Sequence, residues 1–211
     1  FIKNYPVLVW SFFFGLILAS SFIIGRTIGS WNFQKVISLI FGAFIAFSIT
    51  RLSPTENPES LFYIFISGAI AICAMVLPGV SGSFILLLMG SYTLILKAIN
   101  ELNLTVVIVF SFGCMIGLLS FAKLLNKLFK IYRDLTIAVL TGFLIGSIDK
   151  VWPWKIVVQT RVDSSGEIVP FIERSIMPYY FEGDPKILLS LCLSAAGFFI
   201  VYALNRHSTK N

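Results

Sequence analysis

A proline followed by two glycines and two serines interrupts a long apolar stretch that runs from Leu61 to Leu96. The residues of this break are Pro78, Gly79, Ser81, Gly82 and Ser83. They cannot continue a helix, because proline removes a backbone donor and glycine is a poor helix former. Serine hydroxyls beside the free N–H groups at the start of a helix are donors for an oxyanion such as phosphate. The break therefore predicts an anion site, and the alternative is a proline-kinked helix whose glycines serve packing.

The break also predicts a cavity. Inside a bilayer, non-helical backbone is tolerated only where protein buries it or water reaches it. We therefore expect the half-helix after the break, capped by Ser83, to point its free N–H groups into a cavity. Broken helices hold anionic substrates in membrane transporters in this way.

The cations that could complete an anion site lie at the ends of apolar segments. Arg26 follows the first segment and Arg51 ends the second. Arg26 is the preferred partner, because a guanidinium binds phosphate bidentately and the Lys97 ammonium cannot. The alternative for each arginine is a snorkelling side chain that anchors a helix at the membrane interface.

Other chemistries lack the residues that they need. His207 is the only histidine, and the three cysteines lie in apolar stretches, which removes most metal sites and histidine-based nucleophilic catalysis. Two serines without a base do not form a serine hydrolase. No basic face interleaved with aromatic residues supports nucleic-acid binding. We therefore predict no enzymatic activity, no metal or other cofactor and no nucleic-acid partner.

The elements that must position the break are membrane helices. Hydrophobic residues make up 57% of the chain and charged residues only 12%, about half the charged share of a soluble domain. Five segments are long enough, or nearly so, to cross a bilayer that needs about 20 apolar residues; they are residues 6–24, 33–49, 61–77, 104–119 and 187–204. Two further apolar stretches, residues 84–96 and 135–148, are short. The predicted fold class is an all-α integral membrane protein, with one transmembrane domain over residues 1–211.

The positive charges predict the orientation of the spans. The densest basic run is assigned to the cytoplasm; it consists of Lys123, Lys127, Lys130 and Arg133. A re-entrant hairpin over residues 61–96 then places residues 51–60 and 97–103 outside and the C-terminus in the cytoplasm. Asp134 is in that case the one acid on the cytoplasmic side. A break that crosses the membrane fully is less favoured, because it moves the acidic residues 51–60 inside.

Residues 149–186 are predicted to form an external loop. Trp152-Pro153-Trp154 is typical of an aromatic anchor at the membrane interface. Residues 156–162 and 168–171 favour strands, with Ser164-Ser165-Gly166 between them, which predicts a small β-hairpin. The loop either covers the mouth of the cavity or only connects two spans.

Glycines at four-residue spacing predict close packing between helices. The pairs are Gly25 with Gly29, Gly113 with Gly117, and Gly142 with Gly146. They indicate a compact bundle and carry no chemistry of their own.

Residues 71–92, AICAMVLPGVSGSFILLLMGSY, resemble the second signature of a bacterial membrane family, formerly a domain of unknown function. This family consists of polyprenyl-phosphate transporters, which return undecaprenyl phosphate across the cytoplasmic membrane. Gly142–Ser147 followed by WPWK resembles a second pattern of the family, and the resemblance extends from about Pro6 to the tail. It implies two inverted repeats with a re-entrant hairpin in each.

The chain departs from the family pattern at one point. No Pro-Gly-x-Ser-Gly-Gly-like motif precedes Pro78, although the family carries one in an N-terminal half, and the chain opens on Phe1. We therefore expect that an N-terminal part is absent. In that case the chain holds the second half of the fold and the connecting spans.

The resemblance implies a flippase of the bacterial inner membrane that recycles undecaprenyl phosphate or a related polyprenyl phosphate. The phosphate head would sit at residues 79–83 while the isoprenoid tail stays in lipid, which avoids moving a charge through hydrocarbon. Two other functions stay open: a non-transporting membrane subunit that binds a lipid or a partner, and a small-anion transporter. The coupling ion and the oligomeric state do not follow from the sequence, which is compatible with a homo-oligomer.

Overall fold

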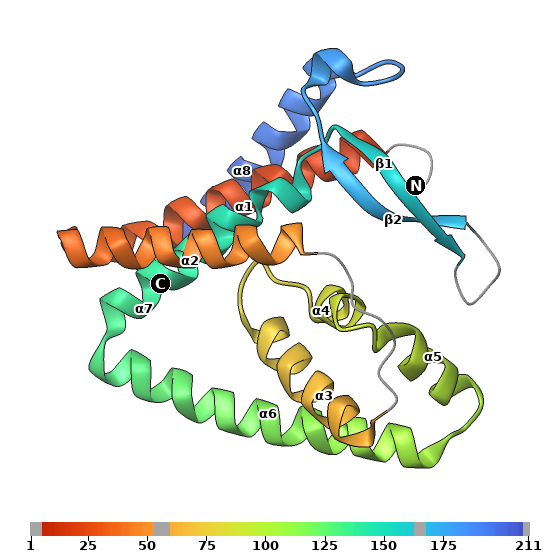
Figure 1. Ribbon diagram of the computed structural model, residues 1–211. Coiled ribbons are helices and arrows are strands. Elements are labelled where there is room, and N and C mark those ends of the chain that lie inside the picture. Colours follow the sequence, from red (N-terminus) through yellow and green to blue (C-terminus); the bar gives the residue numbers. More distant parts are fainter. Residues whose placement is uncertain (1–5, 53–59, 163–167, 209–211) are drawn as a thin grey trace. The chain divides into compact units, whose positions relative to one another are not determined.

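The computed structural model describes residues 6–52, 60–162 and 168–208 (Figure 1). The helices are α1 Pro6–Arg26, α2 Phe33–Arg51, α3 Leu61–Val76, α4 Gly82–Leu88, α5 Tyr92–Asn100, α6 Leu104–Ile131, α7 Arg133–Gly146 and α8 Ile187–Ser208. Two short 3₁₀ helices, η1 Ser147–Val151 and η2 Pro178–Tyr180, and two strands, β1 Lys155–Val162 and β2 Ile168–Ser175, complete the described elements. The chain divides into two compact units. Unit 1 consists of residues 1–50 and 137–211, and unit 2 consists of residues 51–136.

The predicted all-α class is confirmed, and each of the five predicted spans is a helix. Four helices are long and apolar enough to cross a membrane: α1, α2, α6 and α8. The fifth, α3, has 16 residues and is shorter than the about 20 that a spanning helix needs. Large apolar side chains on these helices are exposed, such as Phe33 (79%) and Leu188 (80%). Lipid is the solvent in which such side chains are stable.

In unit 1, α1 and α8 pack against each other through small residues (Figure 1). A Cβ atom at Gly15 would overlap the carbonyl group of Ser194, and one at Gly197 would lie 2.5 Å from the carbonyl oxygen of Phe12. The Ser194 hydroxyl donates to the carbonyl oxygen of Ser11 over 2.8 Å. Close backbone approach and a hydrogen bond between helices are the usual means by which membrane helices associate.

Two of the three predicted glycine pairs pack as expected. Cβ atoms at Gly142 and Gly146 of α7 would overlap backbone carbonyl oxygens of α2. A Cβ atom at Gly113 of α6 would overlap the backbone carbonyl oxygen of Phe65 in α3. A Cβ at Gly117 would lie 2.6 Å from the Cα of Ala69. The third pair was predicted wrongly: nothing lies within 4 Å of such an atom at Gly29. The reason is that α1 ends at Arg26, so Gly29 belongs to the turn and not to the helix.

The two segments predicted to favour strands form β1 and β2. The strands are antiparallel, with Lys155 paired to Ser175 and Val162 paired to Ile168. β2 reaches Ser175, four residues beyond the predicted end. The register shifts on either side of Gln159, which is where the ladder is locally irregular.

The stretch predicted as one short helix over residues 84–96 is two helices. α4 ends at Leu88, α5 begins at Tyr92, and their axes are bent by 105°. Gly90 lies between them with φ 66°, a left-handed conformation that glycine adopts without a steric penalty. Its N–H donates to the carbonyl oxygen of Leu87 over 3.0 Å. This second break was missed because Gly90 and Ser91 lie inside a continuous apolar run.

Candidate functional site

The predicted anion site lies in unit 2, where the chain turns from α3 into α4. α3 ends at Val76, and Leu77 is extended with φ −75° and ψ 130°. Gly79 has φ 83°, so this position needs a residue without a Cβ atom. Pro78 is half-buried and Gly79 is exposed. The residues of the break therefore end one helix and turn the chain for the next.

The two serines of the break lie together at the start of α4. Ser81 caps the helix, because its Oγ accepts from the backbone N–H of Phe84 over a long 3.4 Å. The prediction that Ser83 is the cap was wrong, since the helix already begins at Gly82. The Oγ atoms of Ser81 and Ser83 are 2.9 Å apart, and both residues are exposed. Two hydroxyls thus lie beside the first N–H groups of α4, for which the helix itself supplies no partner.

Gly82 has a packing role, as the alternative interpretation of the break expected of its glycines. It is buried, and a Cβ atom there would lie 2.7 Å from the carbonyl oxygen of Ala71 and 3.2 Å from the Cβ of Met75. Its lack of a side chain lets α4 lie close to α3. Its backbone N–H stays a predicted donor, but a larger residue here would disturb the helix pair as well as any anion.

α4 is shorter than the half-helix that was expected to hold the anion. It has seven residues, so few peptide dipoles are aligned behind the break. The serine hydroxyls and the first N–H groups therefore carry more of the predicted anion binding than the dipole does.

Hydrogen bonds hold the turn between α4 and α5 on α3. The Tyr63 hydroxyl donates to the carbonyl oxygen of Met89 over 3.2 Å. The hydroxyls of Ser67 and Ser91 are 2.8 Å apart, and both residues are fully buried. Because Gly82 lies against the C-terminal part of α3 and Met89 against its N-terminal part, α4 runs back along α3. This is a hairpin of helices, and its re-entrant position in a membrane stays a prediction.

The two arginines predicted to pair with the anion lie elsewhere in the chain. Arg26 ends α1 in unit 1, is exposed, and places its guanidinium 4.8 Å from the centre of the Phe22 ring. This contact fits the alternative of an interfacial anchor. Arg51 is the last residue of α2 and is also exposed. The pairing of either arginine with a phosphate stays a prediction.

Acidic and metal-binding side chains do not gather in the described part of the chain. No three His, Cys, Asp or Glu residues among those described are close enough to hold a metal ion. The three cysteines are free thiols. The donors at the break are neutral: the hydroxyls of Ser81 and Ser83 and the first backbone N–H groups of α4.

A buried cation in unit 1 was not predicted. The Lys155 side chain is 8% exposed, and its Nζ lies 3.3 Å from Glu173 Oε2 and 3.9 Å from the centre of the Trp10 ring. Nζ also donates to the carbonyl oxygen of Lys150 over 2.7 Å. Burial lowers the pKa of this ammonium from its usual 10.5, and the carboxylate of Glu173 opposes the shift in part. Lys155 therefore ties the start of β1 to α1 and to β2.

Comparison with known proteins gives a consistent result. Residues 1–169 match the family described as undecaprenyl phosphate translocase-like. A protein of Vibrio cholerae serotype O1 named polyprenyl-phosphate transporter is 44% identical over 211 residues, which cover 98% of this chain and 68% of that protein. A Staphylococcus aureus protein of the same name is 35% identical over 105 residues, which cover 47% of this chain and 37% of that protein. No solved structure gives a significant match.

Proposed function

Because this chain belongs to the undecaprenyl phosphate translocase-like family, we propose that it transports undecaprenyl phosphate or a related polyprenyl phosphate across a membrane. The proposed position of the phosphate head is supported by one observation. The hydroxyls of Ser81 and Ser83 are exposed and lie 2.9 Å apart at the start of α4. The proposed activity moves the lipid and leaves its bonds unchanged.

In the proposed mechanism the phosphate head binds at residues 79–83. The hydroxyls of Ser81 and Ser83 and the N–H groups of Gly82 and Ser83 donate to its oxygens, while the isoprenoid tail stays among lipid chains. A charge that crossed hydrocarbon without such donors would cost several kcal/mol or more. Alternating access of the break to the two sides of the membrane then transfers the head.

A phosphate needs more positive charge than these donors supply. It carries about two negative charges, whereas a helix end contributes about half a positive charge. We propose Arg26 as the cationic partner and Arg51 as the second candidate. Arg26→Lys should impair transport nearly as much as Arg26→Ala, because the bidentate geometry is lost with either change.

The proposed location is the bacterial cytoplasmic membrane, with the C-terminus in the cytoplasm. Support comes from the basic end of α6 and the segment after it, where Lys123, Lys127, Lys130 and Arg133 are all exposed. Basic residues near the ends of spans are retained in the cytoplasm.

The test uses the full chain reconstituted in liposomes that contain polyprenyl phosphate. Ser81→Ala combined with Ser83→Ala should lower lipid-phosphate affinity by about ten- to a hundredfold for each charge-assisted hydrogen bond lost. Ser20→Ala is the matched control, since its hydroxyl donates to the Leu16 carbonyl of its own helix. Unchanged phosphate binding in the double variant would show that the glycines and serines of the break serve packing alone. Binding without flipping would indicate a non-transporting lipid-binding subunit.

A further inference from the structure

The helix α6 turns one side toward α3 and the opposite side away from it. A Cβ atom at Gly113 would overlap the backbone of Phe65, and one at Gly117 would lie 2.6 Å from the Cα of Ala69, so both glycines face α3. Residues three or four positions apart share a helix face. One such series lies on the side opposite the glycines and is 47–57% exposed; it begins with Ile108, Phe112, Ile116 and Leu119. In a bilayer this side of α6 therefore faces lipid chains.

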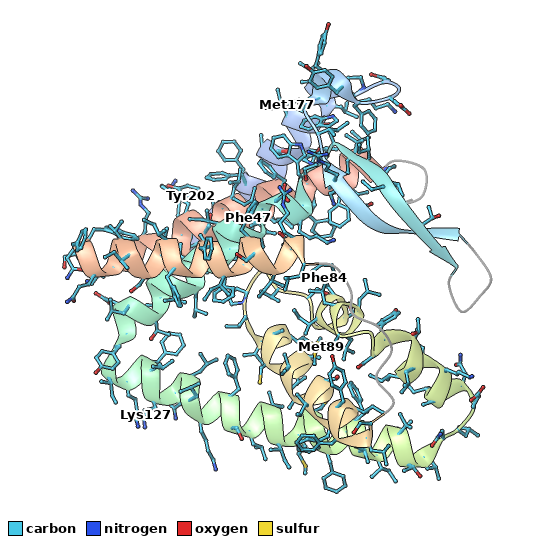
Figure 2. The ribbon with its side chains drawn as sticks, viewed as in Figure 1. Phe47, Phe84, Met89, Lys127, Met177 and Tyr202 are labelled. Atoms are coloured by element: carbon cyan, nitrogen blue, oxygen red, sulfur yellow. The ribbon has the colours of Figure 1, made fainter. Side chains whose placement is uncertain are left out.

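The same series continues with three exposed lysines, again three or four positions apart: Lys123, Lys127 and Lys130. The leucines of these turns lie on the side of the glycines; they are Leu124, Leu125 and Leu128. Figure 2 shows Lys127 on the side of α6 away from α3. The last turns of α6 thus keep their cations apart from their apolar side chains. We call the three lysines the basic face of α6.

The series changes from apolar to basic where the hydrocarbon of a bilayer ends. From Leu104 to Lys123, α6 rises about 28 Å at 1.5 Å per residue, and the hydrocarbon core is about 30 Å thick. From Lys123 to Lys130 the helix rises about 10 Å more, which spans the headgroup layer of roughly 5–8 Å. Lysine side chains at this depth keep their stems along apolar surface and their ammonium groups among the headgroups. With Leu104 at the opposite edge of the hydrocarbon, the basic face lies at the depth of the lipid phosphates.

The charge of the basic face is not offset within the described part of the chain. The helix α6 contains no Asp or Glu, and no described acidic side chain forms a salt bridge with the three lysines. Like charges three or four positions apart destabilise a helix. The retention of basic residues in the cytoplasm is achieved by lysines on any face, so it does not explain why all three lie on one side. An anion outside the protein accounts for both observations.

We propose that the basic face of α6 binds the headgroup phosphates of anionic phospholipids in the leaflet where α6 ends. The acyl chains of these lipids lie along Ile116 and Leu119 on the same side of the helix. Three cations spread over about 10 Å are more than one phosphate head contacts, so the leaflet fits better than a single polyprenyl phosphate. The site is on the side of α6 away from α3 and does not depend on the proposed transport.

The experiment compares an anionic with a zwitterionic phospholipid. The purified full chain in detergent at low salt is titrated with phosphatidylglycerol and with phosphatidylcholine of the same acyl chains, and bound lipid is counted by native mass spectrometry. The wild type should bind phosphatidylglycerol more tightly. Replacement of Lys123, Lys127 and Lys130 by Gln should lower this preference by about fivefold for each lysine, the usual contribution of one cation near an anionic surface. Replacement of the same three by Arg should keep the preference, because the charge is retained.

The matched control removes the same charge from other exposed positions. Lys97→Gln, Arg174→Gln and Arg206→Gln together give the same net charge and should leave the preference for phosphatidylglycerol as in the wild type. An equal loss in this control, or an unchanged preference in the variant with glutamines on the basic face, would overturn the proposal. So would equal affinity of the wild type for both lipids.

A further titration separates phospholipid from the proposed transport substrate. It uses the Ser81→Ala, Ser83→Ala double variant, whose basic face is intact. This variant should bind phosphatidylglycerol as the wild type does. If it bound polyprenyl phosphate more tightly than phosphatidylglycerol, and lost that binding when the three lysines were replaced by Gln, the basic face would hold the substrate and the assignment to phospholipid would be wrong.

Discussion

Lys155 is a buried cation whose charged form is less stable in the folded protein than in water. Its ammonium is removed from water against Trp10, and the partial compensation comes from Glu173 and a backbone carbonyl. Desolvation lowers its pKa in the folded protein below the usual 10.5. A buried lysine with a lowered pKa binds fewer protons in the folded protein than in the unfolded chain between those two values.

This difference predicts how the stability of unit 1 depends on pH. In the window between the lowered pKa and 10.5, the unfolded chain binds more protons, so the free energy of unfolding should rise with pH. Below the window both states are protonated, and the contribution of Lys155 is constant. Lys155→Met removes the titrating group, so the advantage of the wild type over the variant in Tm should grow as the pH approaches 10.5. A difference in Tm that stays constant over the same series of pH values would contradict the argument.

Single residues of the break divide into donors and spacers. Ser81 and Ser83 present exposed hydroxyls, whereas Gly82 is buried and lets α4 approach the Ala71 carbonyl. A variant such as Gly82→Leu would force the helices apart by overpacking. Loss of transport in it would not distinguish anion binding from packing, and for this reason the serines are the informative positions.

The geometry of the α4–α5 bend depends on residues that are distant in the sequence. Tyr63 and Ser67 of α3 bond to Met89 and Ser91 from more than 20 positions away in the chain. The Ser67 hydroxyl also lies 2.8 Å from the carbonyl oxygen of Tyr63. These contacts fix the second break in place, beside a glycine with positive φ.

A double-mutant cycle should show that the two serines act as a pair. Ser67→Ala leaves the buried Ser91 hydroxyl without its short partner, which should cost about 1–3 kcal/mol. Ser91→Ala should cost less, because the Ser67 hydroxyl keeps the Tyr63 carbonyl as its acceptor. The double variant should cost less than the sum of the single variants, because no hydroxyl is then left unpaired. Thermal unfolding of the four proteins in one detergent measures this. Strictly additive costs would mean that the hydroxyls do not interact.

The elements that depend on local composition were predicted well. Long apolar runs specify α1, α2, α6 and α8, because a bilayer leaves the helix as the only open-chain structure without unpaired backbone groups. The β-hairpin followed from β-prone residues around a serine-glycine turn. The break at Pro78 followed from the intrinsic effect of proline on a helix.

Features that depend on tertiary contacts were not predicted. Gly90 ends α4 because Tyr63 and Ser67 bind the turn that follows, and no local pattern distinguishes it from glycines that stay inside helices. Lys155 is buried against Trp10, which is far from it in the sequence. The cap was assigned to Ser83 instead of Ser81 because the first helical residue depends on how closely Gly82 packs on α3.

At the scale of the whole molecule, the predicted orientation of the remaining spans depends on whether the hairpin of α3 and α4 is re-entrant. If α3 enters the membrane and α4 and α5 return to the same side, the segments before and after them share that side. α6 has 28 residues, or about 42 Å at 1.5 Å per residue, and exceeds the about 30 Å of hydrocarbon. Lys127 projects from the last turns of α6 (Figure 2), and we expect the excess length to carry it out of the membrane.

Cysteine labelling in intact cells tests this orientation. In a chain whose Cys73, Cys114 and Cys192 are replaced by alanine, an impermeant maleimide should label Asn57→Cys and Asn100→Cys from outside. Lys127→Cys should react only after the membrane is permeabilised, since basic residues at span ends stay in the cytoplasm. Labelling of positions 57 and 100 from opposite sides would mean that residues 61–100 cross the membrane completely. In that case the break at residues 78–83 would lie in the middle of a segment that crosses the membrane. The proposed phosphate site would then not lie at the tip of a re-entrant hairpin.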